Sequence, residues 1–242
     1  MRVLIISDIH SNLTAFEAVL AHAGDFERVI CLGDVVGYGP DPEECVQLLR
    51  SLPDLICIMG NHDAAVLNVI STGYFNPEAR KALLQQKDLL SQDSINFLRG
   101  LPDILILDEL TLAHGSPRDP IWEYIDQGRV AWAAFEYFDG QGCLVGHTHT
   151  PAIFTESADF KVRLLKPSSG DRWIPSCERF ILNPGAVGQP RDRDPRAAYV
   201  IWDLEENSFM FKRVPYNIST VAERIEQRGI PSLQARRLSL GR

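Results

Sequence analysis

Short apolar runs alternate with amphipathic segments along the first half of the chain. Each run is rich in Val, Ile and Leu and is bounded by glycine or polar residues, which favours strands covered on both faces. The early alternation of such runs with helical patterns predicts parallel strands joined by helical crossovers. We expect strands at residues 3–6, 28–32, 55–59, 104–107, 110–113, 143–145, 180–182, 198–202 and 209–214.

Capping residues mark where the helices begin. Leu13, Phe16 and Leu20 share one helical face, which predicts the first amphipathic helix. Residues 41–44 combine an N-cap aspartate, a proline and two acids, and the pattern N-P-E at 76–78 starts a helix that runs to about Leu90. Further helices are expected at 91–100, at 129–137 and, as two short helices with Pro231 opening the second, within 216–242.

The second half of the chain is richer in strands. Asp108 and Glu109 are expected to turn a hairpin between two apolar runs, and the polar segment 157–178 is expected to be a loop. No repeat or linker divides the sequence, so we expect a single domain over residues 1–242 with a helical tail at about 216–242. The predicted fold class is α/β: a four-layer α-β-β-α sandwich of two mixed β-sheets flanked by helices.

Composition narrows the class of protein. The chain has 242 residues, 45% of them hydrophobic, which is ample for a substantial core. Its net charge of −8 argues against binding to duplex nucleic acid, because neutralising the phosphates supplies most of that affinity.

Cysteine usage and hydropathy bear on the compartment. The five cysteines are odd in number and form no CxxC pair, which favours reduced thiols over a disulfide framework. The apolar run at the N-terminus is shorter than that of a signal peptide, and no stretch reaches the length of a membrane span. We therefore expect a cytoplasmic protein with no membrane partner.

Five of the six histidines follow directly after an apolar run, and only His22 lies within a helical pattern. A single histidine in such a place is more often a surface or hydrogen-bonded residue than a ligand. Five at the ends of successive strands are different, because the carboxyl ends of strands form the ligand crevice of α/β folds. The polar residues at these strand ends are Asp8, His10, Asp34, Asn61, His62, Asp63, His114, His147 and His149.

The chemistry of these strand-end residues points to metal ions. Imidazoles, carboxylates and an amide oxygen suit Mn²⁺, Fe or Zn²⁺, and the absence of cysteine argues against a structural zinc site. Seven candidate ligands are too many for one ion and suit two ions that share a carboxylate. The seven are Asp8, His10, Asp34, Asn61, His114, His147 and His149, with His62 as a non-ligating neighbour.

The same residues resemble the ordered motifs of the calcineurin-like metallophosphoesterase superfamily. The motifs are D-I-H at 8–10, G-D at 33–34, G-N-H-D at 60–63, A-H at 113–114 and G-H-T-H at 146–149. The resemblance covers residues 3 to about 202 and looks closest to the small bacterial phosphodiesterase-like branch, whose later segment is similar to N-P-G-A-V-G-Q-P-R-D at 183–192. The protein-phosphatase motif G-D-x-V-D-R-G is replaced by G-D-V-V-G-Y-G, which argues against a phosphoprotein phosphatase.

The resemblance implies a phosphoesterase with two divalent ions, Mn²⁺ first, with Fe, Zn²⁺, Ni²⁺ or Co²⁺ as alternatives. A hydroxide bridging the ions would attack the phosphodiester, and His62 would protonate the leaving group as general acid. Asp63 would either orient His62 or stabilise its turn. The resemblance assigns one ion to Asp8, His10, Asp34 and His149, and the other to Asp34, Asn61, His114 and His147.

Substrate contacts are less sharply indicated. Tyr38, Arg118 and Arg191 are candidates. For Arg191 and its neighbour Arg193, ion pairs with Asp192 and Asp194 are the favoured alternative. Trp122 and Tyr124 could line a pocket for a base or another flat group, although packing explains such aromatics more often.

Three other functions compete with a phosphodiesterase acting on a small phosphoester or nucleotide. A pyrophosphatase acting on nucleotides or dinucleoside polyphosphates would use the same two ions. A non-catalytic metal-binding scaffold would be expected to have lost ligands, and none is missing. A nuclease is disfavoured by the acidity of the chain. The natural substrate and the oligomeric state are left open.

Overall fold

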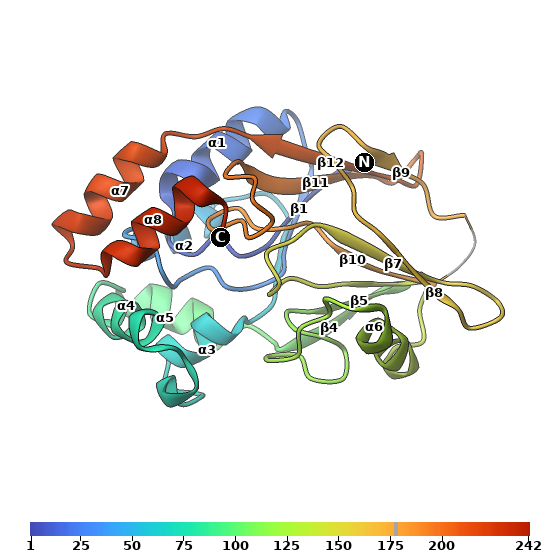
Figure 1. Cartoon of the computed structure of the whole chain (residues 1–242), viewed down its shortest axis with the longest axis horizontal. Coiled ribbons are helices and arrows are strands. Elements are labelled where there is room, and N and C mark those ends of the chain that lie inside the picture. Colours follow the sequence, from blue (N-terminus) through green and yellow to red (C-terminus); the bar gives the residue numbers. More distant parts are fainter. Residues whose placement is uncertain (177–178) are drawn as a thin grey trace.

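Two six-stranded sheets pack face to face in the computed structural model, which describes residues 1–176 and 179–242 (Figure 1). The first sheet has the order β3-β2-β1-β11-β12-β9, in which β1, β2 and β3 are parallel and the rest pair antiparallel. Its strands are β1 (Arg2–Ile6), β2 (Arg28–Cys31), β3 (Leu55–Cys57), β9 (Arg172–Trp173), β11 (Ala197–Asp203) and β12 (Ser208–Val214).

The second sheet has the order β4-β5-β6-β10-β7-β8. Its central strands β5, β6 and β10 are parallel, and the outer pairs are antiparallel. Its strands are β4 (Ile104–Leu107), β5 (Leu110–Ala113), β6 (Gly142–Leu144), β7 (Ala152–Glu156), β8 (Val162–Leu165) and β10 (Arg179–Asn183).

Both faces of the first sheet are covered, which explains its continuous apolar runs. Val3 and Ile5 of β1 point into the core between the sheets. Leu4 and Ile6 point the other way, into a cluster with helices α1 (Leu13–Ala23) and α2 (Pro42–Arg50). The outer face of the second sheet is covered by α6 (Gly128–Ala134) and the short η2 (Phe135–Tyr137). The predicted four-layer sandwich is therefore confirmed.

Three strands and one α-helix were not predicted from the sequence. β7 was not predicted, and β8 and β9 lie inside the segment 157–178 that we expected to be a loop. In the described part of the chain, β8 is an edge strand that pairs with β7 alone. Its residues alternate between partly buried and exposed, so it shows no continuous apolar run. The residues expected to form only a turn after β3 begin the short helix α3 (Asn61–Val66).

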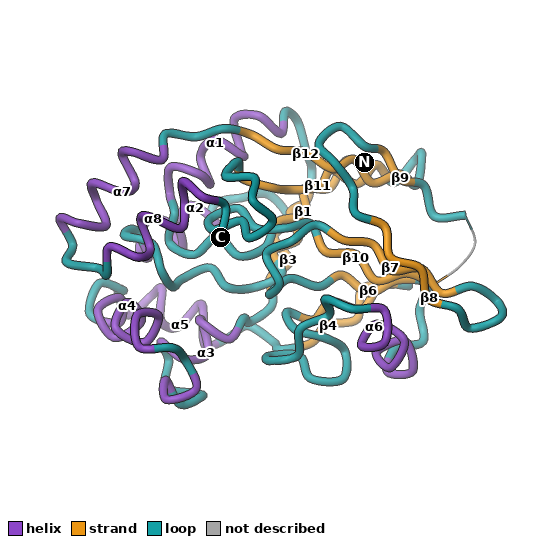
Figure 2. The backbone as a smooth tube through the Cα atoms, viewed as in Figure 1, coloured by secondary structure: helices purple, strands orange, loops and turns teal. Residues whose placement is uncertain are grey.

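The C-terminal tail forms α7 (Ile218–Gln227) and α8 (Ser232–Leu240), which lie beside the helices that follow β3 (Figure 2). The other elements of this region are η1 (Thr72–Tyr74), α4 (Pro77–Lys87) and α5 (Gln92–Arg99). Ala82 of α4 packs with Val221 and Leu238 of the tail. Arg224 of α7 also forms an ion pair with Asp41, the buried residue that precedes α2. The tail is thus joined to the main body by apolar and ionic contacts.

Two further expectations concern cysteines and membranes. Cys31, Cys45, Cys57 and Cys143 are buried free thiols, and Cys177 lies outside the described residues. Within residues 1–176 and 179–242, no helix combines the length and the apolar character needed to cross a bilayer.

Candidate metal centre

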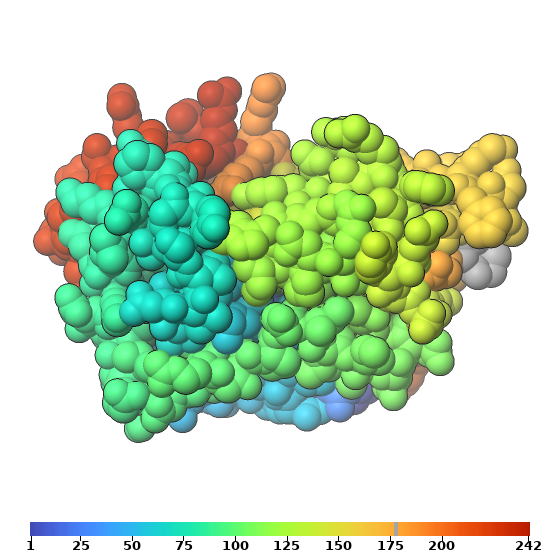
Figure 3. Space-filling view, turned by 90° about the horizontal axis from the view of Figure 1, so that it is seen from below, coloured from blue at the N-terminus to red at the C-terminus, as the bar shows by residue number. Residues whose placement is uncertain are grey.

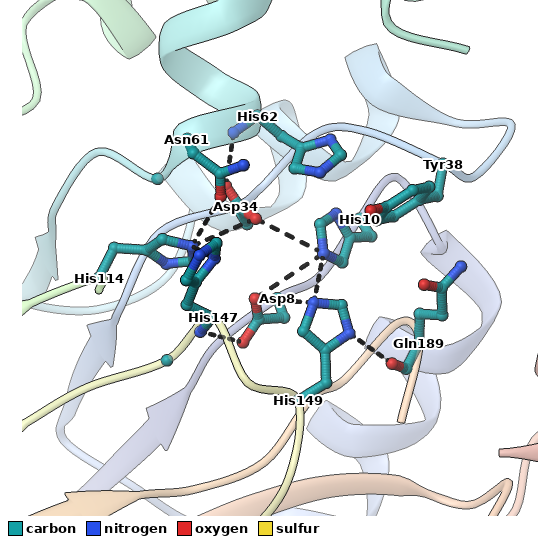
Figure 4. A network of polar contacts seen from close by, with 12 residues as sticks. Asp8, His10, Asp34, Tyr38, Asn61, His62, His114, His147, His149 and Gln189 are labelled. Carbon is teal, nitrogen blue, oxygen red and sulfur yellow. Dashed lines mark hydrogen bonds and ion pairs between the residues drawn. The ribbon is translucent and has the colours of Figure 1, made fainter. Parts of the chain in front are cut away.

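The strand-end residues of both sheets meet in one cluster of side chains (Figure 4). β1, β2 and β3 deliver their following loops from the first sheet, and β5 and β6 do so from the second. None of the seven predicted ligands is more than 3% exposed. The structure therefore brings together residues that are separated by up to 141 positions (149 − 8) in the sequence.

Two groups of ligand atoms share Asp34. Asp8, His10, Asp34 and His149 form one group, and Asp34, His114 and His147 form the other, with the ligand atoms of each group within 4.8 Å of one another. Asn61 joins the second group, because its Oδ1 lies 3.1 Å from His114 Nε2. Asp34 Oδ2 lies between the groups, 3.6 Å from His10 Nε2 and 3.2 Å from His114 Nε2.

Backbone carbonyls orient the four imidazoles. Nδ1 of His10 donates to Val36 O at 3.0 Å, and Nδ1 of His114 donates to Leu32 O at 2.7 Å. His149 Nδ1 and His147 Nε2 likewise contact the carbonyls of Gln189 and Trp122, at 2.5 and 3.2 Å. A carbonyl can only accept, so these ring nitrogens carry the hydrogen, and the other nitrogen of each neutral ring presents a lone pair to the centre.

The inward-facing atoms fit cations. His10 Nε2 faces His149 Nε2 at 3.1 Å, and His114 Nε2 faces His147 Nδ1 at 3.2 Å. One oxygen of Asp8 and one of Asp34 accept a backbone N–H, while Asp8 Oδ1 and Asp34 Oδ2 have no donor among the described residues as long as the histidine rings are neutral. Lone pairs and buried carboxylate oxygens that face one another repel unless positive charge lies between them. Imidazole and carboxylate donors suit divalent ions of intermediate hardness.

The pKa values of the carboxylates and imidazoles at the site also indicate that the site favours positive charge. Burial raises the pKa of Asp8 to about 7 and lowers the pKa of His10 and His147 to about 3. Burial also opposes protonation of His114, but the adjacent Asp34 carboxylate raises its pKa to about 10. The site therefore draws a proton to the junction of the two groups, where a metal ion would supply the charge instead.

Five of the seven predicted ligands adopt left-handed backbone conformations, which residues other than glycine adopt sparingly. Hydrogen bonds between the loops hold this geometry, such as His10 N–H to Asp34 O at 3.0 Å. Such conformations are commonly retained where a functional site requires them. The φ values are 55° for Asp8, 49° for His10, 53° for Asp34, 64° for His147 and 58° for His149.

In the G-N-H-D segment at 60–63, Gly60 and Asp63 have structural roles. Asp63 accepts hydrogen bonds from the N–H groups of Gly60 and Val36, at 3.0 and 3.1 Å, so both oxygens bind backbone and stabilise the turn. Gly60 has a φ of −97°, which any residue can adopt, so the backbone conformation alone does not require glycine here. A Cβ at this position would overlap Asp34, and the close approach of the two loops requires glycine.

His62 lies beside the ligand groups, between aromatic rings. Its ring centroid is 4.4 Å from that of Tyr38 and 4.8 Å from those of His10 and Phe75. Within residues 1–176 and 179–242, its Nδ1 has no hydrogen-bond partner. Burial lowers the pKa of His62 well below its ordinary value, so the imidazole is neutral at pH 7 in the free protein.

A cavity of about 110 Å³ opens directly onto the centre. Arg191 lines it, with its guanidinium 5.6 Å from the Tyr38 ring centroid and donating to Tyr38 Oη at 3.1 Å. The favoured alternative, an ion pair between Arg191 and Asp192, is wrong, because Asp192 pairs with Arg213. Beside the ligands, the lining comprises Tyr38, His62, Tyr74, Phe75, Asn76, Trp122, Tyr124 and Arg191.

Two predicted features lie elsewhere. Arg118, also a predicted substrate contact, is not among the lining residues and instead pairs with Glu123 of its own loop. Asp194, the predicted partner of Arg193, pairs with Arg196. Sequence reasoning missed Tyr74 and Phe75 at the cavity and Gln189, whose carbonyl holds His149. The aromatic pair directly before the helix start at Asn76 was the available signal for the first two.

Comparison with known proteins agrees with this geometry. The model of the family described as "Calcineurin-like phosphoesterase superfamily domain" matches residues 1–207. The crystal structure of a metallophosphoesterase from Sphaerobacter thermophilus superposes over 100% of both chains, with 43% identity and a TM-score of 0.92. An uncharacterized protein of Methanocaldococcus jannaschii is 36% identical over 249 residues, covering 99% of this chain and 98% of its own length.

A more distant likeness is confined to part of the chain. A symmetrical bis(5'-nucleosyl)-tetraphosphatase of Yersinia enterocolitica is 34% identical over 119 residues. That alignment covers 46% of this chain and 40% of the Yersinia enzyme.

Proposed function

Because the chain belongs to the calcineurin-like phosphoesterase superfamily and is a hydrolase of phosphoester bonds, we propose that it is a two-metal phosphodiesterase. The observation that carries this proposal is the sharing of Asp34 between two groups of ligand atoms. With Asn61 included in the second group, each group supplies four protein donors, which match the needs of two ions that share one carboxylate. Mn²⁺ is the proposed ion, and Fe, Zn²⁺, Ni²⁺ and Co²⁺ suit the same donors.

Each of the two groups of residues would hold one ion. One ion falls to Asp8, His10, Asp34 and His149, and the other to Asp34, Asn61, His114 and His147. Bound ions at such sites supply an activated water as nucleophile and stabilise charge on the phosphoryl oxygens. The backbone carbonyls behind the histidines keep each ring in the tautomer that can bind metal.

Arg191 and His62 would act on the substrate. Arg191 carries a permanent charge at the cavity wall, and none of the ion pairs within the described residues involves it, so it is available to a phosphate oxygen. His62 is neutral in the free site, and a bound phosphate anion beside it favours the protonated imidazole. The general-acid proton would therefore be acquired with the substrate and passed to the leaving oxygen.

A second candidate is hydrolysis of dinucleoside polyphosphates. The partial similarity to bis(5'-nucleosyl)-tetraphosphatases favours it over unrelated phosphoester reactions. The same residues would serve, because the attack is again on a phosphorus atom. The two candidates differ only in the leaving group, which is a nucleotide phosphate in one and an alcohol in the other.

The test is hydrolysis of bis(p-nitrophenyl) phosphate by metal-stripped protein, with and without added Mn²⁺, beside hydrolysis of diadenosine tetraphosphate. We expect a rate on the diester that depends on Mn²⁺. Asp34→Asn should abolish this rate and lower the bound metal, measured by elemental analysis, because it removes the charge shared by both groups. Asp103→Asn is the matched control, because Asp103 is exposed, belongs to neither group of ligand atoms and does not line the cavity.

The outcomes separate the candidates. A Mn²⁺-dependent rate on diadenosine tetraphosphate alone would support the second candidate. Folded, metal-loaded protein that hydrolyses neither compound with any of the five ions would contradict both and favour a metal-binding scaffold.

A further inference from the structure

Four aromatic side chains surround the mouth of the cavity. Tyr74 and Phe75 come from η1 and the residue after it, on the side of the first sheet, and Trp122 and Tyr124 come from the loop after β5 of the second. The ring centroid of Trp122 lies 5.8 Å from that of Tyr74 and 5.3 Å from that of Phe75. In Figure 3 the turquoise segment that follows α3 and the yellow-green segment after β5 lie side by side.

Core packing does not explain this aromatic mouth. Tyr74 is 77% exposed and Tyr124 is 46% exposed. Among the described residues, Tyr74, Trp122 and Tyr124 belong to none of the hydrophobic clusters of the fold, although Phe75 packs against one of them. Exposed aromatic surface beside a polar catalytic cavity is typical of a ligand contact.

The mouth continues into a second hollow. This hollow has a volume of about 260 Å³, and Tyr124 and Arg191 line both it and the cavity at the metal ligands. Tyr124 stacks on the ligand His147, with ring centroids 3.9 Å apart and an interplanar angle of 26°. Thr148, Thr150 and Lys166 add polar groups to the wall of the hollow. A ligand that bridges the two spaces would thus meet aromatic faces, hydrogen-bonding groups and a cation.

We propose that the aromatic mouth, formed by Tyr74, Phe75, Trp122 and Tyr124, is a nucleobase-binding subsite, and that the substrates are small nucleotidyl phosphodiesters. This inference rests on the proposed phosphodiesterase function. A nucleotide joins a planar group with polar edges to a phosphate through a single sugar, which matches aromatic walls next to Arg191 and the metal ligands. Stacking on aromatic side chains accepts any base, and the net charge of −8 disfavours long nucleic acids.

The experiment compares three diesters with the same leaving group. Methyl p-nitrophenyl phosphate, bis(p-nitrophenyl) phosphate and thymidine 5'-(p-nitrophenyl phosphate) all release p-nitrophenolate, so they differ in the group that is retained. We expect the thymidine ester to have the highest kcat/KM. Trp122→Ala should lower the ratio of the thymidine to the methyl ester by roughly ten-fold, mainly through KM, as expected when one base loses its stacking partner.

The Trp122 variant is well suited to this comparison because Trp122 contacts His147 through its backbone carbonyl, which alanine retains. Metal content should therefore be unchanged. Trp132→Ala is the matched control, since Trp132 lies on α6, is 49% exposed and lines neither hollow. Trp122→Phe should restore most of the ratio.

The inference is overturned if wild-type protein hydrolyses the thymidine and methyl esters equally, or if Trp122→Ala keeps the thymidine preference. A preference for bis(p-nitrophenyl) phosphate over the thymidine ester would also overturn it, because the mouth would then select aryl groups in general. If no ester is hydrolysed, the proposed function fails separately. Binding of thymidine 5'-monophosphate, measured by calorimetry, then decides: binding weakened by Trp122→Ala supports the subsite, and no binding overturns it.

Discussion

At the scale of single residues, the centre is defined by what the second polar atom of each side chain does. One ring nitrogen of His10 and of His114 donates to a backbone carbonyl, and the other nitrogen faces the centre. One carboxylate oxygen of Asp8 and of Asp34 accepts a hydrogen bond from a backbone N–H, and the other oxygen faces the centre. His62 differs, because its Nδ1 has no hydrogen-bond partner among the described residues, which would suit the proton transfer proposed for it.

His62→Ala should leave the bound metal unchanged and slow the hydrolysis of poor leaving groups most. A general acid contributes about 10²–10⁴ in rate when the leaving oxygen needs a proton, and p-nitrophenolate needs little help. The measurement is kcat/KM for a series of aryl phosphodiesters plotted against the pKa of the leaving phenol, where the slope should steepen.

The control for this prediction is His22→Ala, because His22 lies on α1 and contacts Tyr199 away from the metal ligands. An equal slowing of all esters by His62→Ala would mean that His62 only shapes the cavity.

At the scale of elements, the loop after β10 and the tail helix α8 support the substrate side of the site. Gln189 of this loop is fully buried, and its Nε2 donates to Oε1 of Gln234 on α8 at 3.1 Å. Gln189 Oε1 in turn accepts a hydrogen bond from Arg191 at 3.1 Å. A chain of three side chains thus connects the C-terminal tail to the guanidinium that faces the cavity.

Gln234→Leu should therefore act on both stability and substrate binding. It leaves the buried Gln189 amide without its acceptor, which costs about 1–3 kcal/mol of unfolding free energy. Arg191 would be held less firmly, so KM for bis(p-nitrophenyl) phosphate should rise several-fold with kcat nearly unchanged. Urea unfolding and steady-state kinetics measure the two effects.

Gln92→Leu, at an exposed position of α5, should change neither quantity and is the matched control. If Gln234→Leu lowers stability but leaves KM unchanged, the contact between α8 and the loop is structural only.

At the scale of the whole molecule, the predicted metal ligands come from both sheets. Asp8, His10, Asp34 and Asn61 follow strands of the first sheet, whereas His114, His147 and His149 follow strands of the second. Each group of ligand atoms contains residues from both sheets. Ions bound there would therefore stabilise the packing of the sheets against each other as well as the local loops.

Removing the metal should lower the thermal midpoint. Ligand at about 100 to 1,000 times its Kd stabilises a folded protein by roughly 3–4 kcal/mol. For a domain of this size that corresponds to a fall in Tm of about 10 °C. The measurement is Tm by calorimetry before and after dialysis against EDTA, and again after addition of Mn²⁺.

Asp34→Asn provides the comparison, because its Tm should respond little to EDTA. An unchanged Tm of the wild-type protein on removal of all bound metal would contradict a role of the ions in joining the sheets.

The sequence by itself determined the fold class and indicated which residues gather at the candidate metal centre. Runs such as Val3–Ile6 are buried on both faces, and this burial leaves a continuous apolar run that is visible in the sequence. The polar residues directly after these runs stand out for the same reason, because a buried strand has to end before a carboxylate or an imidazole can meet solvent or a ligand. The assignment of each metal ligand remains a prediction until metal is measured.

Only the tertiary structure decided which groups face one another. Asp63 accepts hydrogen bonds from the backbone rather than from His62. Asp192 forms its ion pair with Arg213, 21 residues away in the sequence, and not with the neighbouring Arg191. The short edge strand β8 and the aromatic mouth were also hidden, since neither forms a continuous apolar run. The physical reason is that a sequence pattern reports how deeply each residue is buried, whereas hydrogen bonds, ion pairs and cavities depend on distances between segments that only packing brings together.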